Sequence, residues 1–428
     1  MTGDAILLKK IKSNDHLSSD QRLDLLIRQL LVISFFNLFL VACLGLLLRM
    51  FPFMDGFPLL FKNVLHSHSH FAFGGWLMPV ILALLARYFR ELRTYISFVH
   101  WRNIAVIFLI SAYGMLFTFP FTGYALYSVI FSSISILGGF YLSVMCWKAI
   151  AASPKKISLQ FLSWALVYFV ISSIGPFTTG PLIVMGYKGE PIYFNAIYFY
   201  LHFQYNGFFA FVVLALFYQM LERRRINTIG NRVLFFLNIS ILPTFFLSVL
   251  WMKPSWIFYV IGGLGAGIQL VSIFWLMKDL KKINWKWNGI EKLFLLAMSV
   301  FVLKMILQFF SAFPFVAEIA FTFRNFIISY LHFVLLGSIS LFLMAAVIQS
   351  YKIELLGRIR AGVNIFFFSL ITTELILVLQ ATLAWMGFAL PKYQEGLFIF
   401  SIFFPVGFWI IWSEIRSQLK WQLSISVK

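Results

Sequence analysis

The chain has 428 residues, of which 61% are hydrophobic and only 11% are charged. A soluble protein is about a quarter charged, so this composition excludes a soluble domain and predicts an all-α, polytopic membrane protein. Its net charge of +19 is explained by basic loops on one side of a membrane. We therefore expect membrane lipid as a partner, and no nucleic acid. The two cysteines, Cys43 and Cys146, lie in apolar runs and indicate neither a disulfide framework nor a CxxC site.

The chain divides into two tails and one membrane domain. Residues 1–23 are polar and charged, so we expect a cytoplasmic tail there and no cleavable signal peptide. Ser18, Ser19 and Asp20 are residues that typically cap a helix, and they precede the first apolar run. The predicted membrane domain is 24–416, and 417–428 is the predicted C-terminal cytoplasmic tail.

Twelve apolar runs follow one another, each close to the ~20 residues that a helix needs to cross a bilayer. No boundary within the bundle and no internal repeat is evident. The predicted spans are 26–48, 64–88, 103–121, 124–147, 158–178, 192–221, 232–252, 256–277, 291–313, 325–349, 362–387 and 396–415.

The basic residues give the expected orientation. With twelve spans, 27 of the 34 Lys and Arg residues fall on the side of the termini and 6 on the other side. Cytoplasmic loops carry the excess of positive charge, so both termini are predicted to be cytoplasmic, in the inner membrane. One outer loop, 176–191, is long, apolar and rich in Gly and Pro, and we expect it to dip back into the membrane surface or cover a site there.

Five histidines lie within the apolar runs. Segment 63–76, NVLHSHSHFAFGGW, holds His66, His68 and His70, while His202 and His332 lie in later spans. An imidazole inside a membrane is costly unless something binds it. We therefore expect these five residues to meet around a haem or a metal.

The predicted depths and faces of the histidines refine this expectation. All five fall roughly 5–15 Å below the outer surface, at 1.5 Å per helical residue. His66 and His70 are four residues apart and share a helix face, whereas His68 points about 200° around. At most two of these three can serve one ligand. The alternative for any single histidine is a hydrogen bond to a backbone carbonyl or another polar side chain.

Three segments resemble the histidine-bearing helices of the haem–copper oxidase catalytic subunit (subunit I), a superfamily that includes the nitric-oxide reductases. They are LHSHSHFAFGG at 65–75, YLHFQYNGFF at 200–209 and YLHFVLLG at 330–337. The resemblance implies a twelve-helix fold with one low-spin haem, which we expect to be b-type. Its axial ligands would be His332 and either His68 or His70. His202 matches the family's first copper ligand, and His66 is a further candidate metal ligand.

The departures from that family are as informative as the matches. Tyr330 stands where the high-spin haem ligand is expected, and Ser255 and Trp256 stand where two copper ligands are expected. A copper site needs about three such ligands, so bound copper is not expected. The resemblance therefore implies a haem protein without an intact oxygen-reducing centre, served by an electron donor or respiratory partner subunits.

Two other functions stay open. One is a working oxidase or nitric-oxide reductase with unusual ligands, in which His66 or His70 helps His202 to bind a metal. The other is a transporter of metal or haem, or a relative of the NnrS-type haem- and copper-binding membrane proteins, which have an early His-x-His segment.

Two charged residues lie deep in predicted spans. Lys304 and Glu374 fall at similar depths, so we expect an ion pair between them. Gln308 is one turn from Lys304 and is expected to join the same network. The alternative roles are a proton relay or a partner for a haem carboxylate.

Overall fold

The structure, a computed structural model, describes residues 17–426 of the chain. It is 85% helix, with no strand in the described part, and twelve of its helices or helix runs are long and apolar enough to cross a membrane. Each predicted span matches one of them. The prediction of an all-α chain with twelve helices able to span a membrane is therefore confirmed for the described residues.

Several spans consist of two or three consecutive helical segments. In chain order the elements are α2 (Ser19–Met50), η1 (Phe51–Phe53), α3 (Phe61–Phe71), η2 (Ala72–Leu77), α4 (Met78–Tyr88), α5 (Arg90–Tyr95), α6 (Phe98–Thr122), α7 (Leu126–Ala151), α8 (Ile157–Ser172), α9 (Ile174–Val184), α10 (Pro191–His202), η3 (Phe203–Phe209), α11 (Ala210–Arg223), α12 (Gly230–Phe245), η4 (Phe246–Met252), α13 (Trp256–Lys281), α14 (Gly289–Phe310), α15 (Pro314–Thr322), α16 (Asn325–His332), η5 (Phe333–Ser340), α17 (Leu341–Ser350), α18 (Gly357–Trp385), α19 (Tyr393–Ser401) and α20 (Phe403–Ser426).

Parts of both predicted tails are helical. Helix α2 begins at Ser19, because the Ser18 hydroxyl accepts a hydrogen bond from the backbone of Gln21 and caps the helix. Helix α20 continues to Ser426, through most of the predicted tail 417–428. Residues 1–16 and 427–428, the remainder of the two tails, lie outside the described residues.

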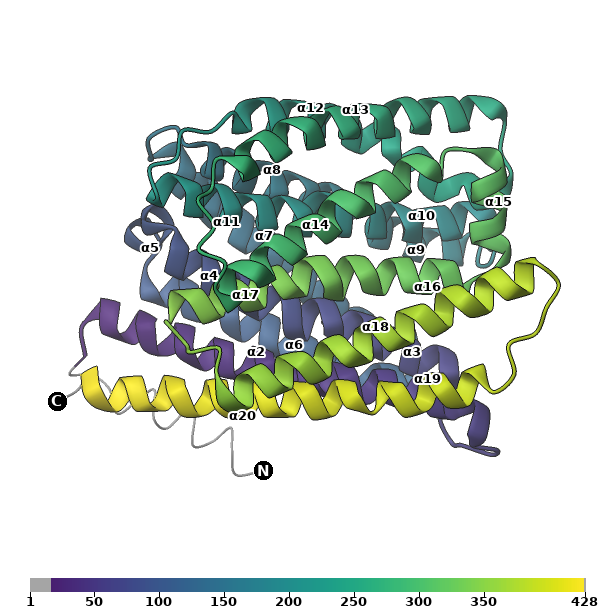
Figure 1. The fold of residues 1–428 in the computed structure, drawn as a ribbon, viewed down its shortest axis with the longest axis horizontal. Coiled ribbons are helices and arrows are strands. Elements are labelled where there is room, and N and C mark those ends of the chain that lie inside the picture. The colour runs from purple at the N-terminus through teal and green to yellow at the C-terminus, as the bar shows by residue number, and fades with distance from the viewer. Residues whose placement is uncertain (1–16, 427–428) are drawn as a thin grey trace.

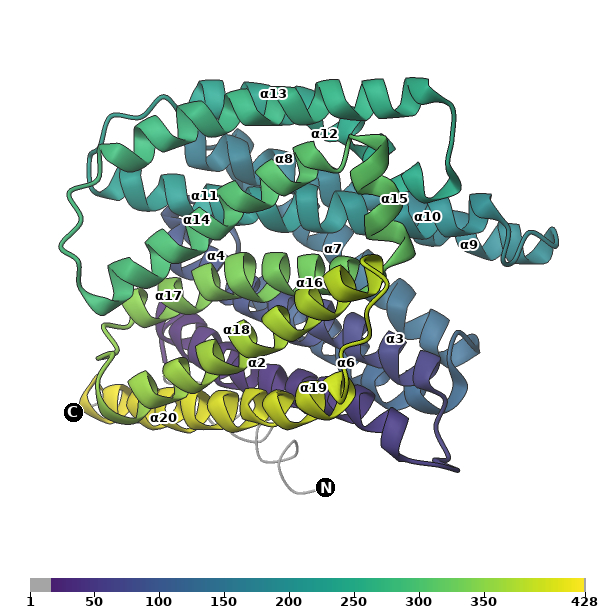
Figure 2. The same ribbon diagram turned by 45° about the vertical axis from the view of Figure 1, so that its right-hand side comes forward.

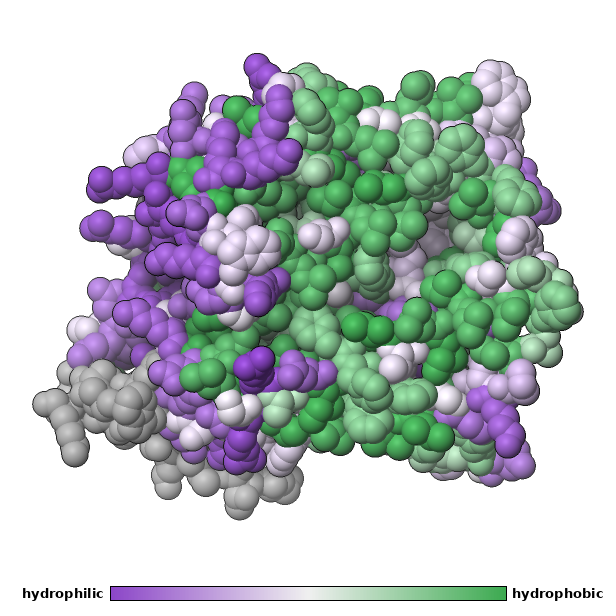
Figure 3. All heavy atoms as spheres, viewed as in Figure 1, coloured by the Kyte–Doolittle hydropathy of each residue, from purple (hydrophilic) through white to green (hydrophobic). Residues whose placement is uncertain are grey.

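The start of α2 and the end of α20 lie at the same end of the bundle, on the left in Figure 1. We call this the terminal end, and the other the opposite end. Hydrophilic residues gather at the terminal end, while the middle of the visible face is hydrophobic (Figure 3). This separation agrees with the predicted distribution of Lys and Arg residues between the two sides.

The loop predicted at 176–191 is largely helical. Helix α9 continues the fifth span to Val184, and α10 begins at Pro191. Figure 2 shows the connection between them projecting beyond the other helices at the opposite end. The helical part of this segment is Ile174–Val184, and residues 185–190 connect it to α10.

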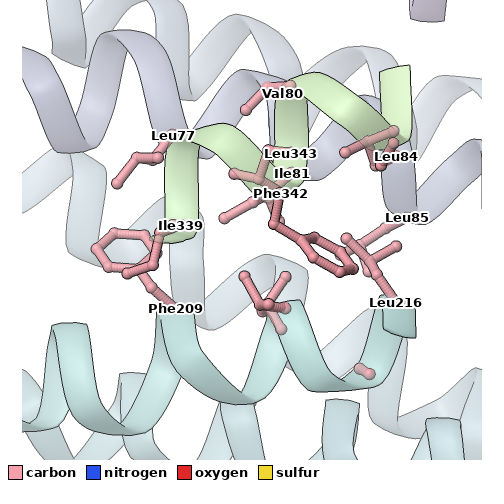
Figure 4. Packing of buried hydrophobic residues seen from close by; sticks show 14 of the residues in the cluster. Leu77, Val80, Ile81, Leu84, Leu85, Phe209, Leu216, Ile339, Phe342 and Leu343 are labelled. Atoms are coloured by element: carbon pink, nitrogen blue, oxygen red, sulfur yellow. The ribbon is translucent and has the colours of Figure 1, made fainter. Parts of the chain in front are cut away.

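Three spans form the centre of the bundle. The second, sixth and tenth spans have 78%, 78% and 72% of their most apolar stretch buried, compared with at most 56% for any other span. Their terminal-end halves are α4, α11 and α17, whose side chains meet in the core shown in Figure 4. Leu84, Leu216 and Phe342 are examples, one from each span. These same three spans carry the five histidines.

The three central spans also share a short internal repeat, contrary to the expectation of none. His-Phe followed by three residues and Gly occurs at 70–75, 202–207 and 332–337. In each span this motif leads into a π-helical segment, η2, η3 or η5, and no other described span contains one. The repeat was missed because it covers only six residues and only two of its side chains are distinctive.

Candidate functional site

Along each central span, a π-helical segment lies between the helix that carries the histidines and the helix, α4, α11 or α17, that packs in the core. A π-helix places an extra residue in a turn, opens the backbone hydrogen-bonding pattern, and is frequent at functional sites. In η2 the Gly75 carbonyl accepts a hydrogen bond from Asn37 Nδ2 of α2, at 2.7 Å. In η3 Gly207 faces Tyr168, where a Cβ atom would come within 2.6 Å of the tyrosine Cβ. The altered turns therefore depend on specific neighbours in adjoining helices.

The five histidines do not converge on one metal ion, so that part of the expectation is not met in the described residues. Their partners divide them into three groups: His68 and His332, each held through Nδ1; His66 and His70, beside Tyr124; and His202 alone. No cluster of three or more His, Cys, Asp or Glu side chains suited to a metal is present in the described part of the chain. The helical spacing correctly separated His68 from His66 and His70, but it gave no information about contacts between spans.

His68 faces α2. Its Nδ1 lies 3.0 Å from the Val41 carbonyl oxygen, to which a protonated Nδ1 donates. The ring lies so close to α2 that a Cβ atom on Gly45 would be 3.2 Å from His68 Cε1. The Nε2 atom makes no hydrogen bond with the described residues. His68 is therefore held by one nitrogen and open at the other.

His332 has the same arrangement on the tenth span. Its Nδ1 lies 3.2 Å from Glu374 Oε1 on α18, and its Nε2 has no partner in the described part of the chain. The side chain is 33% exposed although it lies in a central span, so there is space beside the ring. His68 on α3 is the other histidine that contacts an oxygen through Nδ1 and makes no hydrogen bond through Nε2 with the described residues. His68, rather than His70, therefore shares the arrangement of His332.

Lys304 and Glu374 do not pair with each other, contrary to the prediction. Glu374 contacts His332 and interacts electrostatically with Arg49. The Lys304 ammonium instead donates to Asn206 Oδ1 on the sixth span. Equal depth along two helices says nothing about which way each side chain points around its helix axis, and this is why the prediction failed.

His202 uses both of its ring nitrogens. Its Nε2 lies 2.9 Å from the Ile241 carbonyl, and its Nδ1 is 3.1 Å from the Asn206 amide nitrogen. The Ser248 hydroxyl lies 3.4 Å from the same Nδ1. A metal at His202 would first have to displace one of these bonds. Through Asn206 the ring is joined instead to the buried Lys304 ammonium.

His66 and His70 face α6 and the short turn between α6 and α7. His70 Nε2 lies 2.8 Å from the Tyr124 hydroxyl, and its ring stacks on Phe119 at a centroid distance of 4.6 Å. The His66 ring lies 4.6 Å from the Tyr124 ring, edge to face. His66 Nε2 is buried and has no hydrogen-bond partner in the structure as described.

The remaining predicted positions lie apart from these groups. Tyr330 precedes His332 by two residues and interacts electrostatically with Tyr205 of the sixth span. Ser255 is the residue before α13, and Trp256 begins that helix with 73% of its surface exposed. Gln308 is buried, but its Oε1 has no partner among the described residues, so its expected bond to Lys304 is not observed.

Comparison with known proteins gives no assignment. No protein-family model matches the chain, and no curated protein matches it either. The residues that the sequence analysis did not select are the histidines' partners, namely Val41, Phe119, Tyr124, Asn206 and Ile241. A backbone carbonyl or a common aromatic residue carries no distinctive sequence pattern, so only the fold could have found them.

Proposed function

We propose that the protein binds one low-spin, b-type haem between α3 and α16, with His68 and His332 as the axial ligands, and that it serves electron transfer or the binding of a gas or haem. The main support for this proposal is that the two imidazole rings are held in the same way. Each imidazole is fixed through Nδ1 by a carbonyl or carboxylate oxygen, while its Nε2 is free. A metal-binding histidine is usually held by its second nitrogen in this way.

The haem would supply an iron that changes between two oxidation states. The chain's own residues would orient the two rings, with Val41 holding one and Glu374 the other. The aromatic and aliphatic side chains of the central spans would exclude water from the iron. Arg49 lies in the last turn of α2, the helix that His68 contacts, so it would be the basic residue to pair with a haem carboxylate.

The proposal also covers the fold and the reaction. We propose that the twelve spans adopt the architecture of the haem–copper oxidase catalytic subunit, with the histidine spans second, sixth and tenth. The second metal of an oxidase needs its own ligand cluster. His202 already has partners at both nitrogens, and Trp256 faces away from the core. We therefore favour a haem protein without the oxidase's second metal centre.

A reduced-minus-oxidised absorption spectrum of the purified protein tests the proposal. We expect a sharp low-spin signal that is lost in His68→Ala and in His332→Ala. His70→Ala is the matched control, because this ring lies on the same helix but faces Tyr124, and its spectrum should be kept. A signal that survives His332→Ala, or no haem at all, would overturn the proposal.

Metal content and turnover distinguish the competing functions. We expect one haem, no second metal in the oxidase position, and no consumption of oxygen or nitric oxide with an artificial electron donor. Turnover that disappears in His202→Ala would instead favour an active oxidase or reductase. A protein without haem that moves metal ions into vesicles would favour a transporter.

A further inference from the structure

The pair His66 and His70 is not used by the proposed haem site. The two residues are one helical turn apart on α3. Both rings lie against Tyr124, and His70 also stacks on Phe119. Because His68 faces α2 on the other side of the helix, this group is separate from the one that contains His332.

The group has unused capacity to bind a ligand. His66 Nε2 is buried without a hydrogen-bond partner among the described residues. A buried ring nitrogen is usually satisfied, since leaving it unpaired loses the solvation that it had in water. A structural role for His66 would give this atom a partner. A ligand bound between the two rings would satisfy it.

The distance between His70 and Tyr124 suits a metal ion. A tetrahedral zinc with bonds of about 2.0–2.1 Å holds neighbouring ligand atoms roughly 3.3 Å apart. His70 Nε2 and the Tyr124 oxygen are 2.8 Å apart, so an ion could replace their shared proton after a movement of a few tenths of an ångström. His66, a turn away on the same face, would supply a second imidazole, and water the remaining position.

We propose that His66, His70 and Tyr124 form a binding site for one transition-metal ion, zinc or copper, that is reached from the opposite end of the bundle. Imidazole nitrogens suit both metals, and a phenol oxygen is a compatible third ligand. Tyr124 lies in the turn between α6 and α7 and is 48% exposed, so an ion can enter without crossing the core. Phe119 covers the inner side of the site.

Metal titration of the full-length protein in detergent, after chelator treatment, tests this site. Zn²⁺ alone, or Cu²⁺ alone, is added in competition with a chromophoric chelator. We expect one ion per chain, bound at least tenfold more weakly in His66→Ala and in His70→Ala. Cu²⁺ should bind more tightly than Zn²⁺, following the usual order of affinities. Tyr124→Phe should weaken binding less, because both imidazoles remain.

His66→Ala is the decisive variant, because His66 side-chain nitrogens make no hydrogen bond in the described structure and none is lost with them. His100→Ala is the matched control, since that ring bonds Tyr141 on α7 instead. The visible spectrum of bound Co²⁺ gives a second measurement that reports ligand geometry directly. The proposal fails if His66→Ala binds as tightly as the original protein, if His100→Ala loses the ion equally, or if no ion binds at micromolar concentration.

This inference stands independently of the haem. His332→Ala should leave the metal affinity unchanged, and His66→Ala should leave the haem spectrum unchanged. A shared loss in both variants would show that the five histidines act as one site, which would overturn the separation proposed here.

Discussion

The carboxylate of Glu374 is the residue-scale feature with the clearest functional consequence. It lies within a membrane span, 13% exposed, and its Oε1 atom is 3.2 Å from His332 Nδ1. Ionisable groups at this depth are costly and usually functional. A carboxylate that accepts the Nδ1 proton makes the opposite nitrogen of the ring a stronger ligand. In a haem protein this favours the oxidised iron, which carries the greater positive charge.

We therefore predict that Glu374→Gln raises the reduction potential of the bound haem. A 10- to 100-fold change in the relative stability of the two iron states corresponds to about 60–120 mV. Potentiometric titration of the haem spectrum measures the shift. Glu395→Gln on α19 is the control, because Glu395 is exposed and has no contact with a histidine. An unchanged potential with haem bound would contradict the role of Glu374 without affecting the haem assignment.

At the scale of the elements, the three π-helical segments pack closely against neighbouring helices. Gly207 in η3 lies against Tyr168 of α8, and an added Cβ atom would be 2.6 Å from Tyr168 Cβ and 2.8 Å from its Cγ. The Cβ atom is fixed by the helix backbone and cannot turn away, whatever rotamer Tyr168 adopts. The segment and α8 must therefore separate if any side chain is added.

We predict that Gly207→Ala destabilises the protein by roughly 1–3 kcal/mol, the usual cost of overpacking a core. Thermal unfolding in detergent should show a lower Tm. Gly267→Ala on α13 is the matched control, because no atom lies within 4 Å of its added Cβ, and it should keep or slightly raise the Tm. If the two variants have equal Tm values, the close packing of η3 against α8 is not important for stability.

The elements also show what a sequence can predict. Twelve spans were predictable because a membrane requires about twenty apolar residues per helix, and runs of that length are unambiguous. The faces of His66, His68 and His70 followed from the helical period. Their partners did not, because Val41 and Tyr124 are ordinary residues whose roles depend on which helices adjoin. The π-helical segments were also missed, since one extra residue in a turn leaves the apolar character of the run unchanged.

At the scale of the whole molecule, successive spans run in opposite directions, so their connections lie alternately at the two ends of the bundle. Lys188 and Lys392 lie in connections at the opposite end, after α9 and before α19, whereas Arg224 and Lys282 follow α11 and α13 at the terminal end. The larger number of Lys and Arg residues near the terminal end predicts that this end faces the cytoplasm.

Reporter fusions check this prediction in cells. Fusions at Lys188 and Lys392 should report the outer side, and fusions at Arg224 and Lys282 the inner side. A fusion at one of these positions on the wrong side would break the alternation, and with it the placement of the histidines in the outer half of the bilayer.

Each π-helical segment divides its central span into two halves whose side chains can point in different directions around the helix axis. One additional residue turns everything beyond it by about 100° around the helix axis. The terminal-end halves can therefore keep their apolar faces on the common core (Figure 4), while the histidine-bearing halves aim their rings at α2, α6, α12 and α18. Loss of one residue from η2 would rotate His68 from the Val41 side of α3 while leaving Met78–Tyr88 in place. A change of one residue in a π-helical segment could thus give the histidines new neighbours while the packing of α4, α11 and α17 stays the same.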